Sequence, residues 1–253
     1  MLAHAADRAA SVYVEELTST ELAARVRAGA TTVLVPIGGT EQNGAHMALG
    51  KHNARARALA GRIASALGNA LVAPVIAYVP EGRTDPPSAH MRFPGTITIT
   101  DAAFEQVLDG AARSFRAHGF RDIVFLGDHG GYQKDEQRVA ERLDRQWARS
   151  DVRVHAVPEY YRAASIGYAR LLRDRGYADA EIGTHAGLAD TSLTMALAPQ
   201  LVRSDRVRDT PPPTVAQGVA GDPRRSSAEL GQLGADAIVA DTVAAIRAAR
   251  ARR

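Results

Sequence analysis

The sequence predicts an α/β protein built around a mainly parallel sheet with helices on both faces. Short apolar runs alternate along the chain with longer segments in which apolar residues recur every three or four positions. The short runs are typical of buried strands, and the longer segments are typical of amphipathic helices. The chain has 253 residues, of which 45% are hydrophobic, so it is long enough for one domain with a sizeable core.

The first half of the chain supplies two strands and three helices. A capping-box pattern, with Ser19 or Thr20 ahead of Glu21, predicts the first helix, and Gly119 marks the end of the third. Both strands are continuous apolar runs, "TTVLVPIG" and "ALVAPVIAYV". The expected elements are a helix at 18–30, a strand at 31–38, a helix at 53–67, a strand at 70–79, a loop at 80–96 and a helix at 101–119.

The second half continues the alternation and ends in a helix. Asp190 or Thr191 can cap one of its helices. A Pro- and Gly-rich loop, 210–223, precedes the last helix. The other expected elements are a strand at 122–127, a helix at 133–147, a strand at 152–157 and a helix at 191–198.

Composition excludes several classes of protein. The chain has no Cys, which excludes a thiolate nucleophile, a Cys-ligated zinc and a disulfide. No apolar run is long enough for a transmembrane helix, so no membrane partner is expected. The net charge is +3, but the basic residues are spread among acidic ones and form no stripe, so nucleic acid is not expected either.

The N-terminus has two interpretations. Residues 3–6, "AHAA", have the small-x-small form of a signal-peptidase site, without the apolar segment that should precede it. Residues 1–17 are therefore expected to be a leader, either the remnant of a signal peptide or a disordered segment, ahead of one domain at 18–253. The first interpretation favours a periplasmic protein, and the alternative is a cytoplasmic one.

Two polar, Gly-rich segments follow strands that should end at the same edge of the sheet. "GGTEQNGAH" follows the strand at 31–38, and "GDHGG" follows the strand at 122–127. Ligands bind outside the carboxyl ends of parallel strands, so this edge is the expected site. It would bring together Glu41, His52, Asp128 and His129. His185, in "GTHAG", has no obvious packing role and is a further candidate.

Five segments, in this order along the chain, resemble motifs of the creatininase (creatinine amidohydrolase) family. They are "VPIGGTEQNGAHMALGKHN", "FPGTITIT", "GFRDIVFLGDHGGYQ", "HAGLADTSLTMALAP" and "GVAGDP". The resemblance implies a three-layer α/β/α sandwich, usually a homohexamer. It also implies a divalent metal site, often with two zinc or manganese ions, that hydrolyses C–N bonds in cyclic or formyl amides.

The resemblance also implies roles for individual residues. Glu41 and His129 match metal ligands, and His185 matches a residue that transfers protons near the scissile bond. Asp190 matches an acidic position that supplies a metal ligand in many members, and His46 matches the second His of the first motif.

The departures from the motifs bear on the number of ions. Asn43 replaces a motif His, and His52 replaces the Asp expected to bridge two metals. Two cations without a bridging carboxylate repel each other strongly. We therefore expect one ion per subunit, zinc before manganese or iron, held by Glu41, His52 and His129 with Asp190 as a fourth ligand.

The expected reaction is hydrolysis of a small cyclic amide or related C–N bond by metal-activated water. His185 would act as general acid, and Asp128 would orient or deprotonate the water, a role that Asp190 could share. Asn43, His46, Tyr132 and His90 are the expected substrate contacts. Two alternatives remain: a metal-dependent reaction on a lactone or keto-sugar, and a non-catalytic relative that binds a small ligand or serves in an assembly.

Overall fold

The computed structural model describes residues 11–208 and 211–251. Its four strands are β1 (Thr32–Ile37), β2 (Ala70–Val72), β3 (Asp122–Gly127) and β4 (Arg153–Ala156). The longer helices are α2 (Ser19–Arg27), α3 (Lys51–Leu67), α4 (Asp101–Ala117), α5 (Gln133–Gln146), α9 (Leu188–Leu197) and α11 (Ala228–Ala251). Shorter helices are α6 (Pro158–Arg162), α7 (Tyr168–Arg173), α8 (Asp179–Ile182) and α10 (Ser204–Val207), with a π-helical turn, η4 (Ala163–Gly167), between α6 and α7.

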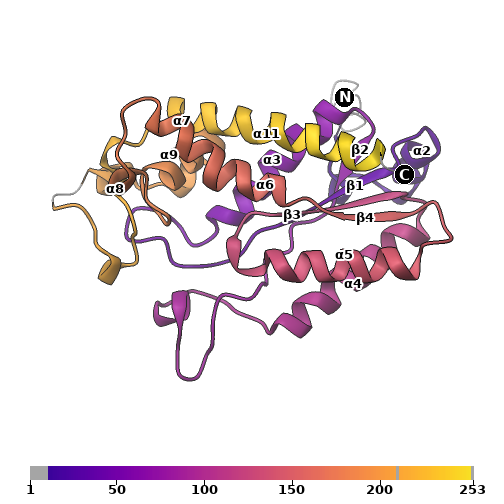
Figure 1. The fold of residues 1–253 in the computed structure, drawn as a ribbon, viewed down its shortest axis with the longest axis horizontal. Coiled ribbons are helices and arrows are strands. Elements are labelled where there is room, and N and C mark those ends of the chain that lie inside the picture. Colours follow the sequence, from indigo (N-terminus) through magenta and orange to yellow (C-terminus); the bar gives the residue numbers. More distant parts are fainter. Residues whose placement is uncertain (1–10, 209–210, 252–253) are drawn as a thin grey trace.

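The four strands form one parallel sheet in the order β2-β1-β3-β4. Helices cover both faces of this sheet, α11 and α6 on one and α4 and α5 on the other (Figure 1). The fold is the three-layer α/β/α arrangement expected from the sequence.

Alternate side chains of β1 and β3 pack on opposite faces of the sheet, each against its own layer of helices. Leu34 and Val124 pack with α3, α9 and α11, whereas Val33 and Ile123 pack with α4 and α5. A strand buried on both faces must be apolar at every position, which explains the continuous apolar runs in the sequence. Within residues 11–208 and 211–251, no helix is long and apolar enough to cross a membrane.

Some boundaries differ from those expected. The strand expected at 70–79 is a regular strand only at Ala70–Val72, because Pro74 has no N–H to donate to a ladder. Beyond this proline, Ile76 pairs with Ile37 as an isolated bridge. The N-cap of α2 is Thr18 rather than Ser19 or Thr20, and its side chain forms the capping box with Glu21. Helix α9 begins at Leu188, three residues before the expected start.

The segment expected to be a leader is partly integrated into the domain. The "AHAA" sequence lies outside the described residues. Val12, however, accepts a hydrogen bond from Val72, and Tyr13 bridges the same residue beside β2. Leu17 packs against the core on the α4 side. The folded unit therefore begins before residue 18.

Candidate active site

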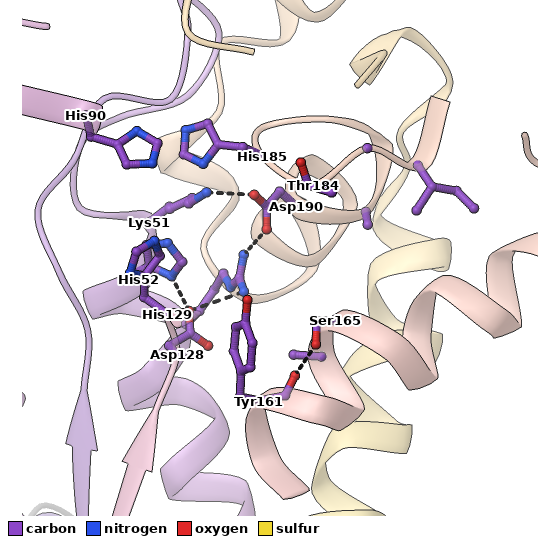
Figure 2. Close-up of a pocket in the computed structure, with 15 residues that line it drawn as sticks. Lys51, His52, His90, Asp128, His129, Tyr161, Ser165, Thr184, His185 and Asp190 are labelled. Atoms are coloured by element: carbon purple, nitrogen blue, oxygen red, sulfur yellow. Dashed lines mark hydrogen bonds and ion pairs between the residues drawn. The ribbon is translucent and has the colours of Figure 1, made fainter. Parts of the chain in front are cut away.

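The candidate site lies where β1, β3 and the start of α3 meet. Ile37 and Gly127, the last residues of β1 and β3, are partners in the sheet register, so the loops that follow leave from one edge. A Cβ at Gly38 would lie 2.8 Å from Asn53 Cα, so a glycine allows the end of β1 to approach α3 closely. A cavity of about 330 Å³ opens at this edge, lined by residues of α3, α6, η4 and the loops before α9 (Figure 2).

Glu41 is the centre of the site. Its side chain is fully buried, and Oε1 lies 2.8 Å from His52 Nε2 and 3.5 Å from Lys51 Nζ. Among the described residues Oε2 has no hydrogen-bond partner, although His90 Nε2 is 3.2 Å away. Burial alone would raise the pKa of Glu41, but the positive charges of Lys51 and His52 hold it far below its usual range. Glu41 is therefore a carboxylate at neutral pH.

His52 connects Glu41 to a second buried carboxylate. Its Nδ1 lies 2.5 Å from Asp128 Oδ2, so each ring nitrogen faces an acid. Burial and Lys51 act to lower the pKa of His52, but the hydrogen bonds to Asp128 and Glu41 raise it above its usual value. A His that donates from both nitrogens is an imidazolium and offers no lone pair to a metal.

Asp128, the carboxylate on the Nδ1 side of His52, contacts three polar side chains. Tyr160 donates its hydroxyl to Oδ1 at 2.8 Å, and Arg55 lies 3.2 Å from Oδ2. With His52 these contacts occupy both oxygens, so Asp128 positions its neighbours rather than activating water as expected.

Two cations at the start of α3 hold Asp190. Lys51 Nζ lies 2.7 Å from Oδ2, and Arg55 NH1 lies 2.7 Å from Oδ1 (Figure 2). The Ala186 backbone N–H donates to Oδ2 at 2.9 Å. Burial alone would raise the pKa of Asp190, but Lys51 and Arg55 hold it well below its usual range. With these partners Asp190 is a structural anion, which does not fit the expected role of fourth metal ligand.

A second acid, Glu81, lies beside Glu41 and, among the described residues, forms no ion pair with a Lys or Arg side chain. Its side chain is fully buried, and neither carboxylate oxygen has a hydrogen-bond partner in the described part of the chain. Burial and the negative charge of Glu41 raise the pKa of Glu81 to about 8.

Unlike His52, the imidazoles of His129 and His185 near Glu41 are neutral. Burial lowers the pKa of His129 to about 4 and, with the charge of Lys51, the pKa of His185 to about 3. His185 Nε2 lies 2.9 Å from the carbonyl oxygen of Gln42, and its Nδ1 lies 3.6 Å from Glu41 Oε1. A neutral His185 cannot be the resting general acid that we expected, but it can accept a proton.

Among the described residues, two groups of three side chains could hold a metal ion. One is Glu41, His90 and His185; the other is Glu41, Glu81 and His129. In each group the ligand atoms all lie within 4.8 Å of one another. His52 belongs to neither group, so the expected set of Glu41, His52 and His129 is not the one that the geometry favours.

The structure thus brings Glu41, His52, Asp128 and His129 together as expected, with His90 and His185 at the same cavity. Three expected substrate contacts lie elsewhere, and all three are at most 2% exposed. The Asn43 side-chain amide donates to the carbonyls of Glu41 and Ala48. His46 Nε2 lies 3.1 Å from Thr191 Oγ1 and from the carbonyl oxygen of Ala186.

Tyr132 is the third of these residues. Its hydroxyl lies 2.6 Å from the carbonyl oxygen of Gly38 and accepts a hydrogen bond from the His129 N–H. It therefore supports the loop that carries His129 and does not contact the cavity.

Three residues of the site were not expected from the sequence: Lys51, Arg55 and Glu81. Lys51 is one of two lysines in the chain and directly precedes His52, which is a weak signal. Arg55 is one of many arginines, and Glu81 is one of two acids in the loop at 80–96. Nothing in the local sequence marks them as buried.

Comparison with known proteins decides the family. The family model for creatininase, described as creatinine amidohydrolase, matches residues 15–246. The chain belongs to the creatininase family. It is 29% identical over 259 residues to the creatinine amidohydrolase of Pseudomonas putida, covering 94% of this chain and 96% of the relative. It is 30% identical over 225 residues to the mycofactocin precursor peptide peptidase of Mycolicibacterium smegmatis, covering 79% and 78%.

The fold agrees with creatininase structures. The solved structure described as "Creatininase Mn" matches with a TM-score of 0.75 and 29% identity, over 94% of this chain and 98% of that one. Family membership confirms the resemblance read from the motifs and the expected class of enzyme, a metal-dependent amidohydrolase. It leaves the substrate open.

Proposed function

We propose that this creatininase-family protein hydrolyses a C–N bond in a small amide by using one divalent metal ion held at Glu41. The observation that carries this proposal is the central position of Glu41, an ionised and fully buried carboxylate shared by both groups of ligand side chains.

The residues fit a divalent ion. Glu41 Oε2 is a buried carboxylate oxygen without a hydrogen-bond partner, and such an atom is satisfied by a cation. The neutral imidazoles of His90, His129 and His185 are suitable ligands, because a metal binds deprotonated nitrogen. Carboxylate and imidazole donors suit zinc, manganese or iron(II). When bound, such an ion lowers the pKa of water and polarises a carbonyl group.

One ion is favoured over two by the charges nearby. Both ligand groups share Glu41, and the Lys51 ammonium already lies 3.5 Å from this carboxylate. A second divalent ion would sit close to the first and to this ammonium, without a further bridging acid.

The chain's own residues would position the substrate and move the protons. Lys51 places a fixed positive charge in the cavity wall, where it can attract the oxygen of a polarised amide. His185 is neutral and anchored through Nε2, so its Nδ1 can take a proton from the attacking water and pass it to the leaving nitrogen. The cavity of about 330 Å³ is the size of a small-molecule site.

The test uses protein stripped with a chelator and then reloaded with zinc or manganese. Turnover of a panel of lactams, hydantoins, formamides and lactones should be lost on stripping, restored on reloading and absent in His129→Ala. Turnover of lactones alone would support the alternative reaction class. Turnover that survives stripping, or that survives in His129→Ala, would show that this site is not the catalytic one.

We also propose that the subunits form a homo-oligomer, as family resemblance suggests. Light scattering coupled to gel filtration would measure the mass, and the mass of a single 26.9 kDa chain would refute this proposal.

A further inference from the structure

Glu81 is a buried acid whose carboxylate has no hydrogen-bond partner within residues 11–208 and 211–251. Its backbone is held in place, since the N–H donates to Thr98 Oγ1 at 2.9 Å. The residue is 3% exposed, and neither carboxylate oxygen meets a hydrogen-bond partner from the part of the chain that the structure describes. A carboxyl group buried in this way costs free energy in either protonation state, because even its protonated form has a hydroxyl to donate.

The space around Glu81 is kept open toward the site. Gly39 has a φ of 145°, and a Cβ there would lie 2.6 Å from Glu81 Oε1. A side chain at position 39 would therefore occupy the place of the carboxylate. On the other side, His129 Nδ1 lies 3.8 Å from Glu81 Oε2.

Three buried carboxylate oxygens that have no hydrogen-bond partner among the described residues belong to Glu41 and Glu81. They are Glu81 Oε1, Glu81 Oε2 and Glu41 Oε2. His129 Nε2 lies 3.9 Å from Glu41 Oε2, and the ligand atoms of the three side chains lie within 4.8 Å of one another. The 3.9 Å separation is too long for a direct hydrogen bond, and it is short enough for two atoms that each lie about 2.0–2.2 Å from one cation.

The positively charged side chains nearest to this group already form ion pairs with other acids. Lys51 pairs with Asp190, and His52 lies between Glu41 Oε1 and Asp128. Glu41 Oε2, which has no hydrogen-bond partner among the described residues, lies 3.9 Å from His129 Nε2 and 3.2 Å from His90 Nε2, so it can serve either group. The rival group, Glu41 with His90 and His185, has only one carboxylate, and His185 lies on the Oε1 side, where Lys51 is.

We infer that Glu81 is a metal ligand and that the ion lies between Glu41, Glu81 and His129. This inference rests on the proposed metal dependence of the enzyme and names the ligand set. It leaves His90 and His185 free to contact the substrate and to transfer protons.

The test measures metal binding directly. Chelator-stripped protein is titrated with Mn²⁺ by calorimetry, and bound manganese is counted by elemental analysis after desalting. The variants are Glu81→Gln, Glu81→Asp and His90→Gln. Glu136→Gln is the matched control, since Glu136 is also a buried acid with an unpartnered oxygen but lies on α5, outside both groups.

The unaltered chain, His90→Gln and Glu136→Gln should each bind one Mn²⁺ with similar affinity. Glu81→Gln should bind at least about 100-fold more weakly, since even outer-shell partners of a metal typically change affinity 10–100-fold. Glu81→Asp keeps the charge but retracts the carboxylate, so its affinity should be intermediate. This gradation is not expected of a purely structural residue, and thermal unfolding checks that each stripped variant is folded.

Glu81→Gln that binds Mn²⁺ like the unaltered chain would overturn the inference. Loss of binding in His90→Gln alone would place the ion in the rival group and overturn it as well. The inference and the proposed function can fail separately. Glu81-dependent binding without turnover of any amide would refute the reaction only, and metal-dependent turnover unchanged in Glu81→Gln would refute the ligand only.

Discussion

Replacing Arg55 by Met tests whether the buried ion pairs beneath the site stabilise the fold. The Arg55 side chain is 3% exposed and contacts Asp128 and Asp190, whose side chains are 0% and 20% exposed. Breaking a buried ion pair from one side costs about 3–5 kcal/mol, because it leaves an uncompensated charge. Both acids keep other partners, His52 and Lys51, so we expect a loss of about 3 kcal/mol.

A loss of about 3 kcal/mol is large compared with the total free energy of unfolding of a domain. Domains have free energies of unfolding of about 5–15 kcal/mol. A loss of 1 kcal/mol lowers the melting temperature of a chain of this size by about 2–4 °C, so Arg55→Met should melt roughly 6–12 °C lower. Denaturant titration with chelator present, followed by circular dichroism, measures the change without a contribution from metal.

Arg62→Met is the matched control on the same helix. Arg62 pairs with Asp236, but the two side chains are 35% and 58% exposed, and exposed pairs contribute about 1 kcal/mol or less. If the free energies of unfolding of the Arg55 and Arg62 variants fall by amounts that differ by less than about 0.5 kcal/mol, the buried ion pairs stabilise the fold no more than exposed pairs do. The reasoning about this network would then be wrong.

Three further predictions follow from other contacts. The folded chain keeps a proton on Glu81 that the unfolded chain releases, so metal-stripped protein should lose stability as pH rises from about 4.5 to about 8. Glu81→Gln should lose less stability over this range. If the melting temperatures of the two proteins fall in parallel with pH, this prediction is wrong. Tyr160→Phe removes the hydroxyl bond to Asp128 and should cost about 1.5–3 kcal/mol in denaturant titration, so an unchanged midpoint would argue against this bond. Gly110 lies on α4 with open space around its Cα, so Gly110→Ala should raise stability by about 0.5–1 kcal/mol. At Gly127 a Cβ would lie 1.9 Å from a buried carboxylate oxygen, so Gly127→Ala should be clearly destabilised. Equal melting temperatures for the two variants would refute this comparison.

The fold was largely predictable because its periodicities are local. The strand at 122–127 coincides with β3, and the helix at 53–67 lies within α3. Errors arose where a single residue overrides the pattern, as at Pro74, which ends the ladder of β2. Past this point the apolar run is mostly only partly buried, with Tyr78 exposed, and pairs with β1 only through Ile76.

The site was less predictable because its contacts join distant segments. The sequence indicates a parallel sheet, and its topology correctly predicted that Glu41 and His129 lie at the same edge. The roles of His52 and Asp190 depend on the charged side chains that surround each of them, and these come from distant parts of the chain. Lys51 and Asp190 are 139 residues apart, and no local pattern indicates their contact. Glu81 was missed for the same reason, since its significance comes from the partners that it lacks.

The network of Lys51, Arg55, Asp128 and Asp190 also constrains how this chain can diverge. Two cations from α3 meet one acid from the end of β3 and one from α9. Losing any single member leaves an unbalanced charge in the interior, so tolerated substitutions should arrive in compensating pairs. Among natural relatives, position 51 is expected to vary together with position 190, and position 55 with position 128.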